Sequence, residues 1–192
     1  MKRHRACLPI VALSLLVAGC TAPQQERKYR IFFAETGQAL VPGYRLPGES
    51  EYGPLWALVE GGGWQTQDGS GRTKAEFWTS GEFNGDATID YAYILEEVAT
   101  DTRTLVAFVS TAGGYEVVRL DEGFPWGIWL RTREPGRYET AAAAGAGPDS
   151  PESILEFEAE NQVIDFFQAE GGASSFVWNA ATRSFDRFST TD

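Results

Sequence analysis

This chain of 192 residues has very little sulfur and imidazole: it contains two cysteines, one histidine and one methionine, all within the first twenty residues. Residues 21–192 therefore have no thiol for a disulfide, a zinc site or a nucleophile, and no imidazole base or ligand. These absences exclude Ser-His-Asp and Cys-His hydrolases, His-ligated zinc hydrolases and two-His-one-carboxylate iron sites. Any chemistry in this part depends on carboxylates, serine, lysine or tyrosine.

Basic residues are also scarce, with 16 Lys and Arg against 27 Asp and Glu and a formal net charge of −11. Three of the basic residues, Lys2, Arg3 and Arg5, stand at the extreme N-terminus. Without them, 13 basic residues face 27 acidic ones, so the net charge is −14. Such a surface repels phosphate backbones, so we expect no nucleic-acid partner, and it attracts cations instead.

The N-terminus has the organisation of an export signal. Its basic residues precede an apolar run from Leu8 to Val17, which is too short to cross a bilayer as a finished helix. Small residues follow, in the order Val17-Ala18-Gly19-Cys20, and the composition becomes polar at Thr21. These features predict a signal peptide rather than a buried N-terminal helix.

The segment Val17-Ala18-Gly19-Cys20 resembles the bacterial lipobox. The resemblance implies cleavage before Cys20, a diacylglycerol on its sulfur and an acyl chain on the new amino group, so the membrane becomes a partner through this anchor. Thr21, in place of Asp, resembles the sorting pattern of lipoproteins sent to the outer membrane. We therefore expect a lipoprotein signal peptide at 1–19, a flexible tether at 20–28 and a single β-rich domain at 29–192.

Strand-like runs separated by turn residues dominate the rest of the chain and predict a mainly β fold (β-rich α+β). We expect an antiparallel meander sheet or sandwich, with at most a short helix near residues 54–60. The predicted strands are Tyr29 to Ala34, Ala75 to Thr79, Asp90 to Glu96, Thr104 to Ser110, Tyr115 to Leu120, Gly127 to Thr132, Val163 to Gln168, Ser175 to Trp178 and Ser184 to Phe188.

Local patterns refine this expectation. Ala112-Gly113-Gly114 predicts a hairpin loop, and Pro135-Gly136 predicts a further chain reversal. From Leu155 to Ala159, apolar residues alternate with glutamates, which indicates a strand with one solvated face. Trp129 and Trp178 stand within strand-like runs, where we expect them to be buried in the core.

The segment from Gly81 to Ala92 has side-chain oxygens at alternate positions. Glu82, Asn84, Asp86 and Asp90, with a backbone carbonyl near Thr88, have the spacing of a loop that can converge on a hard cation. Calcium accepts about 6 to 8 oxygen ligands in such loops. The alternative is that Asn84-Gly85 makes a tight turn whose acidic side chains accept hydrogen bonds from neighbouring backbone N–H groups.

This segment resembles the D-x-[DN]-x-D-G-x-x-D-Y-A loop of FG-GAP and VCBS-type repeats, which leads directly into a strand. By resemblance, Asn84, Asp86 and Asp90 correspond to the pattern, which implies Ca²⁺ as the ion. Glu82 stands where Asp is usual, and Ala87 stands where Gly is usual. Ala87 must therefore adopt a turn that glycine adopts more easily. More loosely, the chain is similar to small exported bacterial proteins of uncharacterised activity.

Two of the six tryptophans are candidates for ligand binding. Trp64 and Trp126 adjoin Gly63 and Pro125 in expected loops, where an aromatic ring is less easily buried and can stack on a sugar. Acidic pairs such as Glu96-Glu97 also invite comparison with glycosidases. Adjacency in sequence does not place two carboxylates across a cleft, so a solvated face is the favoured interpretation of these pairs.

These observations predict a lipid-anchored envelope protein, most simply in the outer membrane, with a non-enzymatic binding or structural role. The loop from Glu82 to Asp90 adds stabilisation by Ca²⁺ as a further expectation. Two alternatives stay open. One is a carboxylate-dependent enzyme that acts on glycans and uses Trp64 or Trp126 as a subsite. The other is an inhibitor or partner of an envelope enzyme, for which the acidic surface suits a basic target.

Overall fold

The computed structural model describes residues 28–47, 77–124, 128–142, 155–168 and 172–190. Helical structure comprises residues 28–32, the π-helical turn η1 (Phe33–Gly37) and the α-helical turn α2 (Gln38–Leu40). The strands are β1 (Tyr44–Arg45), β2 (Trp78–Gly81), β3 (Asp90–Glu97), β4 (Arg103–Thr111), β5 (Gly114–Glu122), β6 (Ile128–Arg133), β7 (Gly136–Glu139), β8 (Glu156–Ala159), β9 (Val163–Gln168), β10 (Gly172–Asn179) and β11 (Ser184–Thr190).

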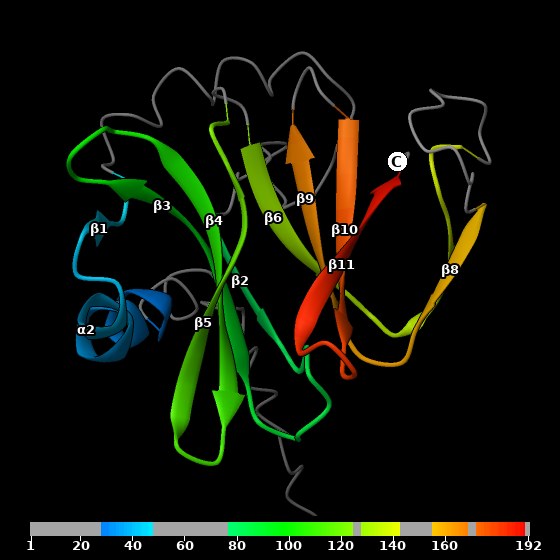
Figure 1. Ribbon diagram of the computed structural model, residues 1–192, viewed down its shortest axis with the longest axis horizontal. Helices are drawn as coiled ribbons and strands as arrows, with labels where there is room; N and C mark the ends of the chain where they lie inside the picture. The colour runs from blue at the N-terminus through cyan, green and yellow to red at the C-terminus, as the bar shows by residue number, and fades with distance from the viewer. Residues whose placement is uncertain (1–27, 48–76, 125–127, 143–154, 169–171, 191–192) are drawn as a thin grey trace, which may run out of the picture.

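The elements are stacked in layers, which Figure 1 shows from left to right. The N-terminal helical segment (residues 28–40) covers sheet A, in which β1 and β2 both pair with β3, followed by β4 and β5. Sheet B has the order β11-β10-β9-β6, and the short pair β7-β8 lies beyond it. The described strand pairs are antiparallel, so the prediction of a β-rich antiparallel fold is confirmed.

The helical segment corrects one prediction, because the run Tyr29 to Ala34 was expected to be a strand. Its aromatic residues Tyr29, Phe32 and Phe33 recur at helical spacing and lie on the face that packs against sheet A. Phe32 stacks on Tyr91 with ring centroids 3.8 Å apart. The Tyr93 hydroxyl donates a hydrogen bond of 2.9 Å to the carbonyl of Tyr29. Burial of these rings outweighs the strand-like composition of the run.

The opposite face of sheet A forms the core with sheet B. Side chains in a strand alternate between the two faces of the sheet. Four fully buried residues of β3 and β4 lie on the face of sheet A opposite the helical segment: Ala92, Ile94, Leu105 and Ala107. They belong to the same apolar cluster as Ile128, Leu130, Ile164, Phe166 and Phe176 of sheet B. Each fully buried large side chain contributes about 1.5–3 kcal/mol through the hydrophobic effect, so packing rather than cross-linking stabilises the molecule.

Polar contacts close the sandwich on both sides. On one side, Thr132 of β6 donates to the carbonyl of Ser80 at 3.0 Å, and its hydroxyl also pairs with Thr79. On the other side, Arg187 of β11 pairs with Asp121 of β5 at 2.6 Å.

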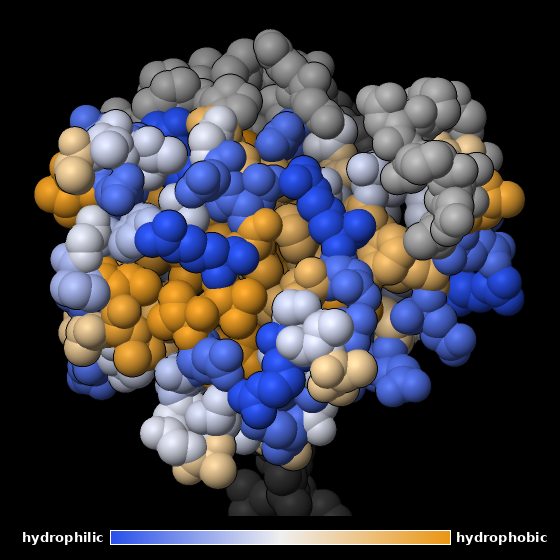
Figure 2. Space-filling view, viewed as in Figure 1, coloured by the Kyte–Doolittle hydropathy of each residue, from blue (hydrophilic) through white to orange (hydrophobic). Residues whose placement is uncertain are grey.

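Figure 2 shows apolar surface over the helical segment and β5, with hydrophilic side chains across it. Three residues of β5 remain only partly buried there: Val117, Val118 and Leu120.

The outer face of sheet B meets the pair β7-β8. Phe157 of β8 stacks on Phe188 of β11 with centroids 4.4 Å apart. In β8, Phe157 and Ala159 are buried while Glu156 and Glu158 are exposed, so the predicted solvated face is confirmed. Trp129 is half-buried rather than in the core, and it stacks on Phe167 on this outer face.

The hairpin through Ala112 and Gly113 is confirmed, since Thr111 pairs directly with Gly114. Trp178 packs beside the core but is also only half-buried. Pro135 precedes β7, where the chain leaves sheet B and enters the pair β7-β8. The helix expected near residues 54–60 lies outside the described residues.

Candidate functional site

The loop from Glu82 to Asp90 leads into β3, and Asp90 is its most buried side chain, with no exposed surface. The Asp90 carboxylate accepts hydrogen bonds from the backbone N–H groups of Phe83 (2.7 Å) and Asn84 (3.1 Å). It also accepts bonds from the N–H and the hydroxyl of Ser110, both at 2.7 Å. Asp90 thus joins the start of the loop to the end of β4, a role that only the β3-β4 pairing makes possible.

Ser110 brings a second carboxylate to the same point. Its Oγ lies 2.7 Å from Asp90 Oδ1 and 2.9 and 2.8 Å from the two oxygens of Asp86. A hydroxyl carries a single hydrogen, so it can donate to only one carboxylate at a time. With both carboxylates ionised, one of the two short oxygen pairs lacks a proton. A bound proton or a cation would relieve this concentration of negative charge.

The two aspartates differ in their acidity. Burial raises the pKa of Asp90 above its ordinary value, even though hydrogen bonds from Ser110, Phe83 and Asn84 oppose the shift. Burial also acts to raise the pKa of Asp86, but hydrogen bonds from Ser110 and the Thr88 N–H outweigh it, and the pKa falls below its ordinary value. Asp90 is therefore the better proton acceptor of the pair, and Asp86 the better permanent anion.

The other predicted ligands form hydrogen bonds within the loop and to Ser110 of β4. The Asn84 amide donates to the Ser110 carbonyl at 2.9 Å, and its oxygen accepts the Asp86 N–H at 3.1 Å. Glu82 Oε1 accepts the Ala87 N–H at 3.0 Å. Thr88 is exposed, and its N–H donates to Asp86 at 2.9 Å. The side-chain oxygens thus serve as acceptors for backbone N–H groups, as the tight-turn alternative requires.

Backbone geometry at two positions bears on the resemblance of this loop to that of FG-GAP and VCBS-type repeats. Gly85 has φ of 76° and Ala87 has φ of 63°, so both adopt the left-handed conformation. Ala87 stands where the repeat loop has glycine and pays a steric penalty there. A Cβ at Gly85 would meet Asn161 Oδ1 at 2.8 Å, so the loop also packs closely on the turn before β9.

No group of three or more Asp, Glu, His or Cys side chains in the described ranges is close enough to hold a metal ion. Asp86 and Asp90 converge as a pair, while Glu82 bonds the N–H of Ala87 instead. Ser110 belongs to the site although the sequence alone did not single it out. It is twenty positions from Asp90 and no local spacing connects the two residues.

A second buried carboxylate, Asp165, lies in sheet B. It is 1% exposed and pairs with Arg131 at 3.0 Å and Arg133 at 2.7 Å, while Ser175 donates to it at 2.7 Å. Arg131 and Ser175 stand directly opposite Asp165 on the two neighbouring strands. The run Val163-Ile164-Asp165-Phe166-Phe167 could have revealed this centre, because one acid interrupts an apolar strand. Its partners satisfy its oxygens, as a structural ion pair requires.

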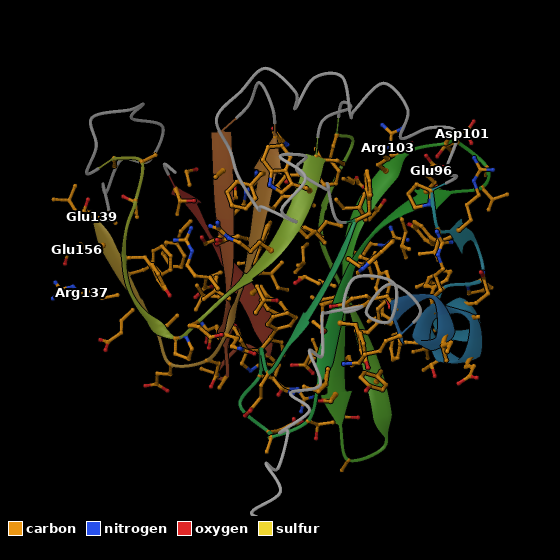
Figure 3. All side chains as sticks on the ribbon, turned by 180° about the vertical axis from the view of Figure 1, so that it is seen from behind. Glu96, Asp101, Arg103, Arg137, Glu139 and Glu156 are labelled. Carbon is orange, nitrogen blue, oxygen red and sulfur yellow. The ribbon has the colours of Figure 1, made fainter. Side chains whose placement is uncertain are left out.

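A third buried carboxylate, Glu96, lies at the far end of sheet A. It contacts Arg45 at 3.0 Å and Arg103 at 3.5 Å, and Arg45 also reaches the exposed Asp101. Figure 3 places this cluster at one end of the molecule and the pair of Arg137 and Glu156 at the other. Asp90, Asp165 and Glu96, the buried carboxylates of the described residues, are thus each held by hydrogen-bond donors or cations from the protein itself.

Cys20, Trp64 and Trp126 lie outside the described residues, so the lipidation and glycan-binding predictions stay predictions. None of the described helices is long and apolar enough to span a membrane. Comparisons of the chain with protein-family models, with curated proteins and with solved structures find no match.

Proposed function

We propose that this chain is a lipid-anchored protein of the bacterial envelope, most simply of the outer membrane, with a non-enzymatic binding or structural role. The observation that carries the proposal is the order Val17-Ala18-Gly19-Cys20 after a basic, apolar leader. A short polar segment then separates Cys20 from the first described helical residue, Lys28. The sandwich supports a non-catalytic role, because Asp90, Asp165 and Glu96 are each held by fixed hydrogen-bond or ion-pair partners.

Cell fractionation tests the anchor. We expect the wild-type chain in the membrane pellet, released by detergent but not by high salt, and the Cys20→Ser variant outside the pellet or retained with its leader uncleaved. The Cys7→Ser variant is the matched control, because Cys7 lies in the predicted signal and should not affect attachment. Release of the wild-type chain by high salt, or equal membrane association of a Cys20→Ser chain whose leader has been removed, would contradict the proposal.

The same proposal includes Ca²⁺ as a stabiliser of the loop from Glu82 to Asp90. Two ionised carboxylates converge on the single hydroxyl hydrogen of Ser110, and a cation beside them would remove their repulsion. Asp86 supports this assignment because its exposed carboxylate stays ionised at neutral pH. Side chains that now accept N–H bonds would have to rotate to complete a coordination shell of about 6 to 8 oxygens.

Thermal unfolding of a soluble Cys20→Ser form of residues 20–192 in Ca²⁺, in Mg²⁺ and in EDTA tests the ion. An occupied site stabilises the folded state by about 2.7 kcal/mol when free Ca²⁺ is 100 times the dissociation constant. We expect a Ca²⁺-specific rise in melting temperature that the Asp86→Ala/Asp90→Ala variant lacks. Identical melting in the three solutions would make the loop a metal-free turn.

A further inference from the structure

The N-terminal helical segment differs in charge from the rest of the described chain. Residues 28–40 carry Lys28 and Arg30 against the single acid Glu35, a net charge of +1. The described residues after 76 carry 7 arginines and 16 acids, so 7 − 16 gives a net charge of −9. The sequence adds Arg27 immediately before the segment. Positive charge therefore gathers where the chain enters the fold.

Aromatic rings of sheet A hold two of these cations in place. The Lys28 ammonium lies 5.6 Å from the centroid of the Tyr91 ring, and the Arg30 guanidinium lies 6.0 Å from that of Trp78. Ile31 is 42% exposed, and as the third residue after Lys28 it shares the same side of the helix. An exposed apolar side chain near cations is an arrangement with which an interfacial helix meets a lipid surface.

The length of chain between Cys20 and Lys28 limits which side of the protein can lie against the bilayer. Residues 21–27 separate Cys20 from Lys28, and eight fully extended steps span at most about 28 Å, while a flexible coil of this length averages about 16 Å. Sheets stack at spacings of about 10 Å, so the pair β7-β8, beyond sheet B, lies at the far side of the layers (Figure 1). A lipid on Cys20 therefore favours a bilayer beside the helical segment over one beside the pair β7-β8.

We infer that the N-terminal helical segment is the membrane-facing side of the protein, with Lys28, Arg30 and Ile31 against the headgroups of an anionic bilayer. The inference rests on the proposed lipidation of Cys20 and adds an orientation to it. The two cations attract anionic headgroups, while the acidic sheets are repelled by the same surface. The sheets of the sandwich thus point away from the lipid.

Labelling of the lipidated full chain in vesicles tests this orientation. Cys7 is in the predicted signal and the Cys20 sulfur carries the lipid, so an introduced cysteine is the single free thiol. Ile31→Cys and Leu155→Cys receive the same polarity-sensitive fluorophore; Leu155 is the control, because it is 54% exposed beside β8. The vesicles contain phosphatidylglycerol and either a lipid-borne nitroxide or, outside, the aqueous quencher iodide.

We expect the label at residue 31 to be quenched severalfold more by the nitroxide, and severalfold less by iodide, than the label at residue 155. Lys28→Gln/Arg30→Gln in the Ile31→Cys background should remove most of this difference without loss of vesicle flotation. Equal quenching of the two labels in a chain that floats would overturn the orientation and leave the anchor intact. A chain that does not float would overturn the proposed anchor, and the orientation would fall with it.

Discussion

Individual residues in this protein illustrate how burial and hydrogen bonding set opposite acidities in one cluster. Asp86 and Asp90 share the hydroxyl of Ser110, yet the pKa of Asp90 is raised and that of Asp86 is lowered. Asp90 has no exposed surface, so desolvation of its charged form dominates. Asp86 is exposed, and its hydrogen bonds favour the charged form.

Asp90→Asn should destabilise the fold by about 2–4 kcal/mol, because the carboxylate accepts four hydrogen bonds and an amide has only one acceptor oxygen. The amide NH₂ would then face buried N–H donors. Urea unfolding of both chains measures the difference. Asp86→Asn is the matched control at an exposed position and should cost less. Equal stability of wild type and Asp90→Asn would contradict the assigned hydrogen bonds.

The raised pKa of Asp90 also gives a pH dependence. The folded state binds a proton at Asp90 more readily than the unfolded state does, so this group stabilises the fold at low pH. Its contribution declines as the pH rises from the ordinary value of 3.8 through the raised pKa. The stability gap between wild type and Asp90→Asn should therefore narrow over that range. A gap that widens with pH would show that the shift has the opposite sign.

Among the secondary-structure elements, some strands could be predicted from the sequence and the N-terminal helical segment could not. The strands from β3 to β5 could be predicted because turn residues separate their β-branched and aromatic runs. The alternation in β8 correctly separated Phe157 from Glu156 and Glu158. The helical segment could not be predicted from composition, because Tyr29 to Ala34 reads as a strand. Its spacing of aromatics at i, i+3 and i+4 was the signal that composition concealed.

Phe33→Ala tests whether aromatic burial holds the helical segment on sheet A. Phe33 is 4% exposed, and its ring lies 5.7 Å from that of Tyr93. Truncation of such a side chain costs about 3–5 kcal/mol, which thermal or urea unfolding measures. Ile31→Ala, at a position 42% exposed, should change stability by about 0.5 kcal/mol or less. Similar small effects of the two substitutions would show that the segment contributes little to the core.

The candidate site could be predicted only in part, because some of its contacts are made by the pairing of strands that are distant in sequence. The loop residues from Glu82 to Asp90 are adjacent in sequence, and their polarity marked them. Ser110 and Asp165 required long-range contacts: Ser110 is brought to Asp90 by the pairing of β3 with β4, and Asp165 meets Arg131 across β9 and β6. Local spacing predicts which oxygens share a turn, but only register predicts what they contact.

At the scale of the whole molecule, the contacts that stabilise the fold are separate from the residue proposed to anchor it. Residues 21–192 contain no cysteine, so the layers are held by apolar packing and by polar contacts such as those between Thr132 and Ser80 and between Arg187 and Asp121. In the proposal, location depends instead on lipidation of Cys20, which lies outside the described residues. The proposed anchor and the charge of the helical segment would together give the acidic sandwich a defined orientation.

The intact mass of the chain purified from membranes is the decisive measurement for the proposed lipid anchor. If Cys20 is lipidated, the protein begins at Cys20 and is heavier than residues 20–192 by a diacylglycerol and an acyl chain. The Cys20→Ser variant should lack both lipid groups. A wild-type chain that retains residues 1–19, or that begins at Cys20 without added lipid mass, would contradict the central claim.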